Sequence, residues 1–271
     1  MLYQASSSIL SPQIDSDIDN TVRTFSTHGL SDLSNSSLMD RVDSKFLIPI
    51  NELINVINGC KNDYSVLKIA GRTKFQYNNL YFDSPNLDFY HHHHNQKLNR
   101  YKVRHRQYAD VGSNYLEIKF KSNKGRTIKN RCLTTENALT ALASNYSFIQ
   151  DHGLINSKQL LPSQFCCYQR ISLANKVCNE RITLDLDINF SNALHQQGGE
   201  NLPSYKLSNF FIAELKQEKL NRQSPFFRLM RKMSLRPKGF SKYCMGVSLT
   251  NNQQIKSNRF KANLVKLERG A

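Results

Sequence analysis

The chain contains the stretch Arg100-Tyr101-Lys102-Val103-Arg104-His105-Arg106-Gln107-Tyr108, in which every second residue up to Arg106 is a cation. Side chains of a β-strand alternate between its two faces, so a strand at this position would carry all of these cations on one face. Cations in a row repel one another. We therefore expect this face either to lie open to water or to meet a polyanion.

The same alternation of charged and apolar residues occurs in three later stretches, at 115–121, 181–188 and 211–216. Strict alternation of this kind predicts β-strands. In the second of these stretches, the apolar face is expected to carry Ile182, Leu184, Leu186 and Ile188. The charged face is expected to carry Arg181, Asp185 and Asp187.

A flat antiparallel sheet with its charged face in water would account for the alternation alone. Two features favour another arrangement. The charged face is rich in arginine, whose guanidinium suits phosphate through paired hydrogen bonds, and the bias recurs on strands that are far apart in the chain. We therefore predict an α+β fold in which the sheet curls into a barrel that is ionic inside and apolar outside, against helices.

The composition narrows the class of partner and the compartment. The chain has 271 residues, a formal net charge of +16 and a pI of about 9.6, which favours a phosphate polymer, a nucleotide, nucleic acid or an anionic membrane surface. No apolar segment approaches the roughly 20 residues that span a bilayer, and no signal peptide is recognisable. Six cysteines without a C-x-x-C pair predict reduced thiols in a cytoplasmic protein.

The chain is expected to have three parts. Residues 1–36 are rich in Ser, Asp and Asn and predict a flexible arm, residues 37–250 predict one globular domain, and residues 251–271 predict a polar, basic tail. Inside the domain, we expect a short helix at 157–161, closed by Pro162, and a loop at 236–243.

A run of four histidines, His91 to His94, suggests a metal site at first sight. The run should end a helix that begins near Leu87, and only histidines three or four residues apart share a helix face. The run therefore offers one usable pair at most, and we expect a polar helix end rather than a metal site.

Several ordered motifs resemble the catalytic domain of the VTC family of polyphosphate polymerases, a branch of the triphosphate tunnel metalloenzymes. The resemblance covers Leu38 to Leu249. The motifs are Asp40-Arg41-Val42-Asp43-Ser44-Lys45, Tyr81-Phe82-Asp83, Arg100-Tyr101-Lys102-Val103-Arg104-His105-Arg106, Leu116-Glu117-Ile118-Lys119, Tyr168-Gln169-Arg170, Ala213-Glu214-Leu215-Lys216 and Phe240-Ser241-Lys242-Tyr243.

The resemblance implies an antiparallel, eight-stranded β-tunnel with flanking helices, in which the γ-phosphoryl group of ATP passes to inorganic polyphosphate with Mn²⁺ or Mg²⁺ as cofactor. The catalytic cations that it implies are Lys45, Arg104, Arg106, Lys119, Arg170 and Lys242. The further phosphate-binding residues that it implies are Arg100, Lys102, Lys129, Tyr168, Lys216, Lys238 and Ser241. Glu214 would bind the metal, and Glu117 would help to position the metal or a neighbouring cation.

One departure from the wider superfamily separates the possible reactions. Tunnel enzymes that hydrolyse triphosphates commonly open with Glu-x-Glu-x-Lys, whereas here Arg41-Val42-Asp43-Ser44-Lys45 keeps the lysine and one carboxylate. This favours the polymerase over a triphosphate hydrolase of the same fold. A polyphosphate-binding module without turnover is a further alternative, and a nucleic-acid binder ranks last because carboxylates share the cationic face.

The resemblance also bears on partners. The eukaryotic VTC complexes carry an inositol-phosphate-sensing domain and membrane spans, which this chain is expected to lack. Regulation and export of the polymer would then need other proteins, such as a membrane-protein partner.

Overall fold

The computed structural model describes residues 10–33, 41–124, 126–154, 160–175, 177–193, 203–251 and 255–269. Its strands are β1 (Thr27–His28), β2 (Val42–Pro49), β3 (Ser65–Leu67), β4 (Lys74–Asp83), β5 (Arg100–Tyr108), β6 (Ser113–Lys121), β7 (Thr127–Thr134), β8 (Leu161–Asn175), β9 (Glu180–Asn192), β10 (Ser204–Leu207) and β11 (Phe210–Gln217). Its α-helices are α1 (Pro12–Val22), α2 (Leu53–Cys60), α3 (Asp88–His94), α4 (Ala141–Ser144), α5 (Tyr146–Asp151), α6 (Pro225–Lys232), α7 (Lys242–Thr250) and α8 (Lys261–Arg269). Short 3₁₀-helices are η1 (Ser31–Leu33), η2 (Ile50–Glu52) and η4 (Asn258–Phe260).

All of these strands belong to one 11-stranded sheet, which confirms the predicted α+β class. Its main path runs β2-β11-β9-β8-β4-β5-β6-β7, and every neighbouring pair along that path is antiparallel. The short strands β1, β3 and β10 attach beside this path. The register places Lys45 opposite Glu214 and Arg104 opposite Glu117, so residues of the charged faces meet in pairs.

The prediction of a closed, eight-stranded tunnel is wrong in two respects. The sheet has three strands beyond the main path, and in the described residues β2 and β7 end that path without pairing with each other. The sheet nevertheless curls far enough for charged side chains near its two ends to influence each other. Burial first, and then the charge of Lys45 on β2, lowers the pKa of Lys119 on β6. We call the open edge between β2 and β7 the seam. Like charges line it, and their repulsion disfavours closure of the seam by hydrogen bonds.

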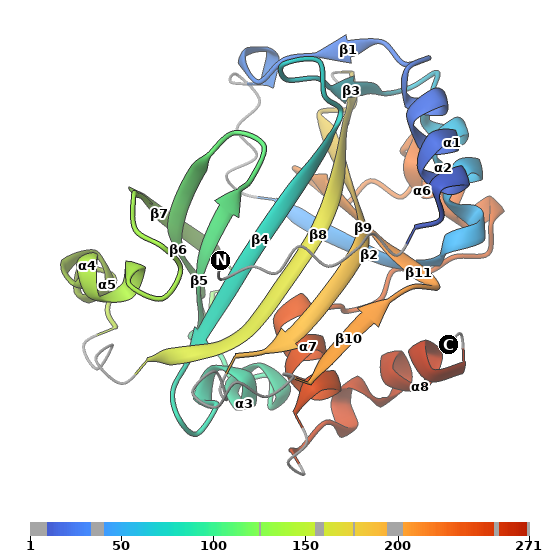
Figure 1. The fold of residues 1–271 in the computed structure, drawn as a ribbon. Helices are drawn as coiled ribbons and strands as arrows, with labels where there is room; N and C mark the ends of the chain where they lie inside the picture. Colours follow the sequence, from blue (N-terminus) through green and yellow to red (C-terminus); the bar gives the residue numbers. More distant parts are fainter. Residues whose placement is uncertain are drawn as a thin grey trace.

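Helices pack on the sheet in three groups, each with its own hydrophobic core (Figure 1). Helices α1, α2 and α6 cover one end of the outer face, and α4 and α5 cover the outer face near β5 to β7. Helices α3, α7 and α8 lie together at the other end of the sheet, where α7 contacts β8 and β9. No helix among the described residues is long and apolar enough to cross a membrane.

A bulge in β9 changes which residues share a face. Asp187 has a φ of 52°, and the register between β8 and β9 shifts at the same point. Leu186 packs with α1, α2 and α6, whereas Ile188 packs in the core beside α7. The prediction that Ile188 shares a face with Leu186 is therefore wrong, and the inner face is ionic only on one side of the bulge.

Helix α7 replaces the last part of the loop predicted at 236–243. Ser241 begins it, since its hydroxyl accepts a hydrogen bond from the backbone N–H of Cys244 at 3.3 Å. Tyr243, Cys244 and Val247 are all buried. A helix that is buried on every side shows no 3.6-residue period, which is why the sequence pattern does not predict it.

The predicted arm and tail are packed against the domain wherever the structure describes them. Ile18 and Val22 of α1 are buried in the core, and Lys74 pairs with Asp15 at 2.5 Å. Leu267 of α8 is buried as well. The expectation of a flexible arm is therefore wrong for residues 10–33, and the polar, basic tail packs on the domain over residues 255–269. An amphipathic helix within a polar segment explains the error about the arm.

Two smaller predictions differ in outcome. The helix predicted at 157–161 falls mostly outside the described residues, and its last residue, Leu161, begins β8 together with Pro162. The histidine run ends α3 as predicted. His94 is buried, and its two ring nitrogens lie 2.9 Å and 2.7 Å from the side-chain oxygens of Asn95 and Asn258, which gives it a packing role.

Candidate active site

Charged side chains gather on the inner face of the curled sheet, beside the N-terminus of α7. We call this set the ionic cluster. Its members are Lys45, Lys102, Arg104, Arg106, Glu117, Lys119, Lys129, Tyr168, Arg170, Asp185, Glu214, Lys216, Ser241 and Lys242. They come from β2, β5, β6, β7, β8, β9, β11 and α7, so segments from one end of the domain to the other build one site.

Glu117 forms the first of three centres within the ionic cluster. Its carboxylate lies 2.6 Å from the guanidinium of Arg104 and 2.6 Å from the ammonium of Lys129, with Arg106 at 4.0 Å. The side chain is only 2% exposed. Burial opposes ionisation, but the neighbouring cations outweigh it and hold the pKa of Glu117 far below its usual range. This carboxylate is therefore a fixed negative charge that orients cations.

Asp185 forms the second centre. Arg170 donates two hydrogen bonds to its carboxylate, at 2.5 Å and 2.9 Å, and Lys242 forms an ion pair with the same group. The side chain of Asp185 is fully buried, and these two cations keep its pKa well below the usual range despite the burial. The ring of Tyr168 lies 5.1 Å from the Arg170 guanidinium and 4.8 Å from the Lys242 ammonium.

Glu214, on the strand next to β2, forms the third centre. Its carboxylate lies 2.5 Å from Lys45 on the neighbouring strand and 3.3 Å from Lys216. Burial raises the pKa of Glu214, but both lysines lower it more strongly, so this pKa lies well below its ordinary value. Burial lowers the pKa of Lys216 to about 8, although Glu214 acts against that shift.

Two further cations of the ionic cluster, Lys102 and Arg106, are held mainly by neutral groups. Lys102 donates to the hydroxyl of Ser241 at 2.9 Å, and burial, followed by nearby cations, lowers its pKa to about 8. Arg106 donates to the Tyr168 hydroxyl at 3.1 Å and to a side-chain amide oxygen at 2.9 Å. The cluster thus holds nine cations against three carboxylates, which is an arrangement suited to a ligand with several negative charges.

The N-terminus of α7 faces this cluster and is held there by a buried hydrogen bond. Tyr243 donates its hydroxyl proton to the carboxylate of Asp83, which also accepts from the backbone N–H groups of Phe89 and Tyr90 at 2.8 Å and 2.9 Å. Burial raises the pKa of Asp83. Because Ser241 and Lys242 begin the helix, this contact positions both of them. Unpaired N–H groups at a helix start favour anions.

Most of the site residues predicted from the sequence meet in the ionic cluster, but two lie at its edge. Arg100 donates to the backbone oxygen of Lys97 at 3.0 Å, and the side chain of Lys238 is exposed. The backbone N–H of Lys238 donates to the carbonyl of Lys45 at 2.7 Å, so this loop is anchored to β2.

The structure also adds Asp185 and Asp83, for which the sequence analysis gave no role in the site. For Asp185 a signal was available, because the alternation in 181–188 places it on the charged face. Asp83 lies within a quoted family motif, but nothing in the sequence shows that its partner is Tyr243, 160 residues later.

The described residues offer no group of three or more His, Cys, Asp or Glu side chains that could hold a metal ion by themselves. The three carboxylates of the ionic cluster belong to separate ion-paired centres. Glu214 fits a divalent cation that takes most of its ligands from phosphate oxygens and water, as Mg²⁺ usually does. Glu117 fits less well, because three cations already surround it.

The chain was compared with known proteins. The family model described as the VTC domain matches residues 40–251. Matching solved structures include a candidate adenylate cyclase from Bacillus halodurans, 12% identical, with 75% of this chain and 96% of that chain covered and a TM-score of 0.47. Another is a candidate adenylyl cyclase from Hippeastrum, described as having a dominant triphosphatase activity, at 13% identity, 77% and 95% coverage and a TM-score of 0.45.

A third is the PH1012 protein from Pyrococcus horikoshii, 11% identical, with 78% of this chain and 99% of that chain covered and a TM-score of 0.42. No curated protein matches the chain. The family model spans well over half of the sequence and contains every member of the ionic cluster. The chain belongs to the VTC domain family.

Proposed function

We propose that this protein is a polyphosphate polymerase, which transfers the γ-phosphoryl group of ATP to the end of an inorganic polyphosphate chain and releases ADP. The observation that carries the proposal is the ionic cluster, with its surplus of cations and its preformed ion pairs. Triphosphate and polyphosphate are the ligands that would neutralise this surplus most fully, because each phosphate group brings at least one charge.

The arrangement suits the chemistry of phosphoryl transfer. The transition state is loose, with charge spread over the phosphoryl oxygens, so catalysis depends on positioning and on charge neutralisation. Arg104, Arg106 and Arg170 would bind phosphate oxygens through paired hydrogen bonds, and the three carboxylates hold the neighbouring cations in place before the substrate arrives. The terminal oxygen of the polyphosphate chain is itself the nucleophile, so no side chain has to act as a base.

A divalent cation, Mn²⁺ or Mg²⁺, would supply further charge neutralisation at the transferred phosphate. Glu214 would hold it, once Lys45 has moved from the carboxylate to a phosphate oxygen. Glu117 takes the second of its two expected roles and positions Arg104 and Lys129. Lys119 and Lys102, which form no ion pair with a carboxylate in the described part of the chain, would bind phosphates directly.

Two observations support this reaction over the alternatives. Strand β2 contributes one carboxylate, Asp43, and the described residues contain no group of three or more His, Cys, Asp or Glu side chains that could hold and activate a hydrolytic water on a metal. The rings of Tyr77 and Tyr168 stack on each other at 5.4 Å and are covered by the Arg170 guanidinium, so they offer no platform for nucleic-acid bases.

The test is to incubate the purified protein with ATP and Mn²⁺ and to resolve the products on a polyphosphate gel beside an ADP assay. We expect a phosphate ladder with a matching amount of ADP. ADP with orthophosphate alone would show a triphosphate hydrolase instead. Tight polyphosphate binding without turnover would show a binding module.

A further inference from the structure

A cavity of about 90 Å³ lies beside the ionic cluster but contains none of its residues. Three segments form it, all at the upper end of the sheet in Figure 1. They are Leu30 after β1, the end of β3 with its connection to β4 and the first part of β4, and the end of β5 with the turn to β6. Its wall is mainly apolar and aromatic. Leu30 and Val111 flank it and are 63% and 56% exposed, which is unusual for large apolar side chains.

The wall of the cavity is fixed by backbone hydrogen bonds. The N–H groups of Val111 and Gly112 donate to the carbonyl of Tyr108 at 3.1 Å and 2.9 Å, and Ala109 donates to the carbonyl of Gln76 at 3.1 Å. Gly112 has a φ of 70°, a conformation that glycine adopts without strain. The cavity is therefore formed before any ligand enters, as small-molecule sites usually are.

Two tyrosines connect the cavity to the ionic cluster. Tyr77 and Tyr108 line the cavity. The guanidinium of Arg106 lies 5.2 Å from the Tyr77 ring and 5.8 Å from the Tyr108 ring, and the guanidinium of Arg170 lies 4.8 Å from the Tyr77 ring. A single molecule could therefore bind these arginines through a negatively charged end and place an adjoining uncharged end in the cavity.

We propose that this cavity holds the base of the nucleoside triphosphate whose phosphates bind to the ionic cluster. The inference rests on the proposed function. The flat faces of a base would pack against the apolar side chains of Leu30 and Val111. An amino or ring N–H group on its edge would donate to Asp110, whose carboxylate is the charged group in the wall.

Asp110 is well placed for this role. Its two oxygens already accept from Arg72 at 2.9 Å and from the backbone N–H of Gln76 at 2.6 Å, which fixes the carboxylate. A carboxylate has about four lone-pair sites, so acceptor capacity is left for the base. An inorganic polyphosphate chain has neither an apolar part nor a donor edge. The cavity would therefore bind the nucleotide donor and not the polymer.

The proposal is tested by calorimetry with two ligands that share a triphosphate, ATP and inorganic tripolyphosphate. In the double variant Leu30→Asn/Val111→Asn, we expect the affinity for ATP to fall about tenfold or more, as the loss of apolar contacts implies, and the affinity for tripolyphosphate to change less than about twofold. The matched control is Val177→Asn/Leu220→Asn, which changes two exposed apolar residues, 96% and 47% exposed, in other turns. It should change neither affinity.

Equal losses for both ligands, or no loss for ATP, would overturn the nucleobase site and leave the proposed function standing. If the unaltered protein binds no tripolyphosphate, the proposed function itself fails. The variant Asp110→Asn gives a second readout, because it should change the ratio of affinities for ATP, GTP and UTP. An unchanged ratio would contradict the assigned role of Asp110.

Discussion

At the scale of single residues, each of the three carboxylates of the ionic cluster lies between cations. The three carboxylates differ in how readily they can separate from these cations. Glu117 and Asp185 are 2% and 0% exposed, whereas Glu214 is 15% exposed and is held by two flexible lysines. A lysine is a single charge on a flexible stem and gives up a carboxylate more readily than a bidentate arginine does. Under the proposed function, Glu214 is therefore the carboxylate that would most readily exchange a lysine for the metal ion.

The variant Glu214→Gln should separate binding from turnover. It removes the negative charge while retaining the shape, so we expect turnover with Mn²⁺ to fall roughly 100-fold or more, because a metal ion stabilises the charge of the transition state by several kcal/mol. Metal-free binding of tripolyphosphate should become tighter, because Lys45 and Lys216 lose their internal partner. Product assays and calorimetry measure the two effects.

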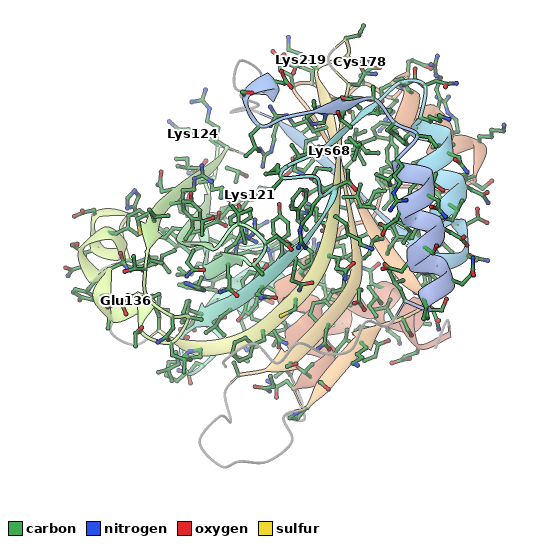
Figure 2. All side chains as sticks on the ribbon, turned by 45° about the horizontal axis from the view of Figure 1, so that its top comes forward. Lys68, Lys121, Lys124, Glu136, Cys178 and Lys219 are labelled. Carbon is green, nitrogen blue, oxygen red and sulfur yellow. The ribbon has the colours of Figure 1, made fainter. Side chains whose placement is uncertain are left out.

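The matched control for this variant is Glu136→Gln. Glu136 is a glutamate in the segment before α4, labelled at the left of Figure 2, and its carboxylate accepts from the Thr140 hydroxyl at 2.9 Å, outside the ionic cluster. It should leave both turnover and binding unchanged. If Glu214→Gln retained full activity, Glu214 would have no role in holding a metal.

Lys102 and Lys216 predict opposite pH trends for stability and for binding. Burial lowers the pKa of each to about 8, whereas a lysine in an unfolded chain titrates near 10.4. Between these values the unfolded chain binds more protons than the native protein does. The free energy of unfolding of the ligand-free protein should therefore rise as the pH increases from about 8 to 10, as far as these lysines contribute.

Binding of tripolyphosphate should weaken over the same pH range, because the phosphates need charged ammonium groups. Denaturant unfolding and calorimetry at several pH values measure the two trends. In the double variant Lys102→Met/Lys216→Met, both trends should become shallower. Affinity that stayed constant from pH 7.5 to pH 9.5 would contradict the assignment of these lysines as phosphate ligands.

At the scale of elements, helix α7 delivers Ser241 and Lys242 to the ionic cluster, and the bond from Tyr243 to Asp83 sets its position. We expect Tyr243→Phe to lower stability by about 1–2 kcal/mol, the usual cost of a lost buried hydrogen bond, and also to reduce turnover. Tyr90→Phe is the matched control, since its hydroxyl contacts Ser248, further along the same helix, at 3.0 Å.

Thermal unfolding and product assays compare these two variants. Tyr90→Phe should lose a similar amount of stability and keep its turnover, because Ser248 lies away from the helix start. Equal losses of turnover in both would show that Tyr243 supports the fold in general rather than the start of α7.

A glycine allows α7 to approach the sheet closely. A Cβ atom at Gly246 would lie 2.8 Å from the ring of Phe190 and 2.9 Å from the side chain of Gln164. Gly246→Ala should therefore destabilise the protein by about 1–3 kcal/mol through overpacking, although alanine favours a helix by roughly 1 kcal/mol. Gly239→Ala, where a Cβ atom meets nothing within 4 Å, should leave the melting temperature almost unchanged.

The elements also show how far the sequence could predict the site. Alternation predicted which residues of β5, β6 and β11 face inward, because a strand period of two needs no distant information. The bulge at Asp187 and the buried helix α7 depend on contacts made by distant parts of the chain. The pairing of Asp185 with Lys242 across 57 residues depends on the same contacts, and no local pattern contains it.

At the scale of the whole molecule, lysines from both ends of the sheet gather where the sheet fails to close. In the described residues β2 and β7 each pair on one side only, and Lys45, Lys119 and Lys129 lie near the seam between them. Repulsion between these lysines disfavours closure in the ligand-free protein. A polyphosphate ligand that binds cations from both ends of the sheet would replace that repulsion with attraction.

Binding of tripolyphosphate should therefore reduce opening of the seam. At a ligand concentration of about 100 times Kd, which corresponds to roughly 2.7 kcal/mol of stabilisation, we expect amide hydrogen exchange in β2 and β7 to slow by about tenfold or more. Exchange in α4 and α5, which pack on the outer face beside β7 but carry no member of the ionic cluster, should change little. Salt at about 1 M, where the Debye length is near 3 Å, should largely reverse the protection. Protection that rose equally in the seam strands and in α4 and α5 would show that the ligand stabilises the fold as a whole without bridging the two ends of the sheet.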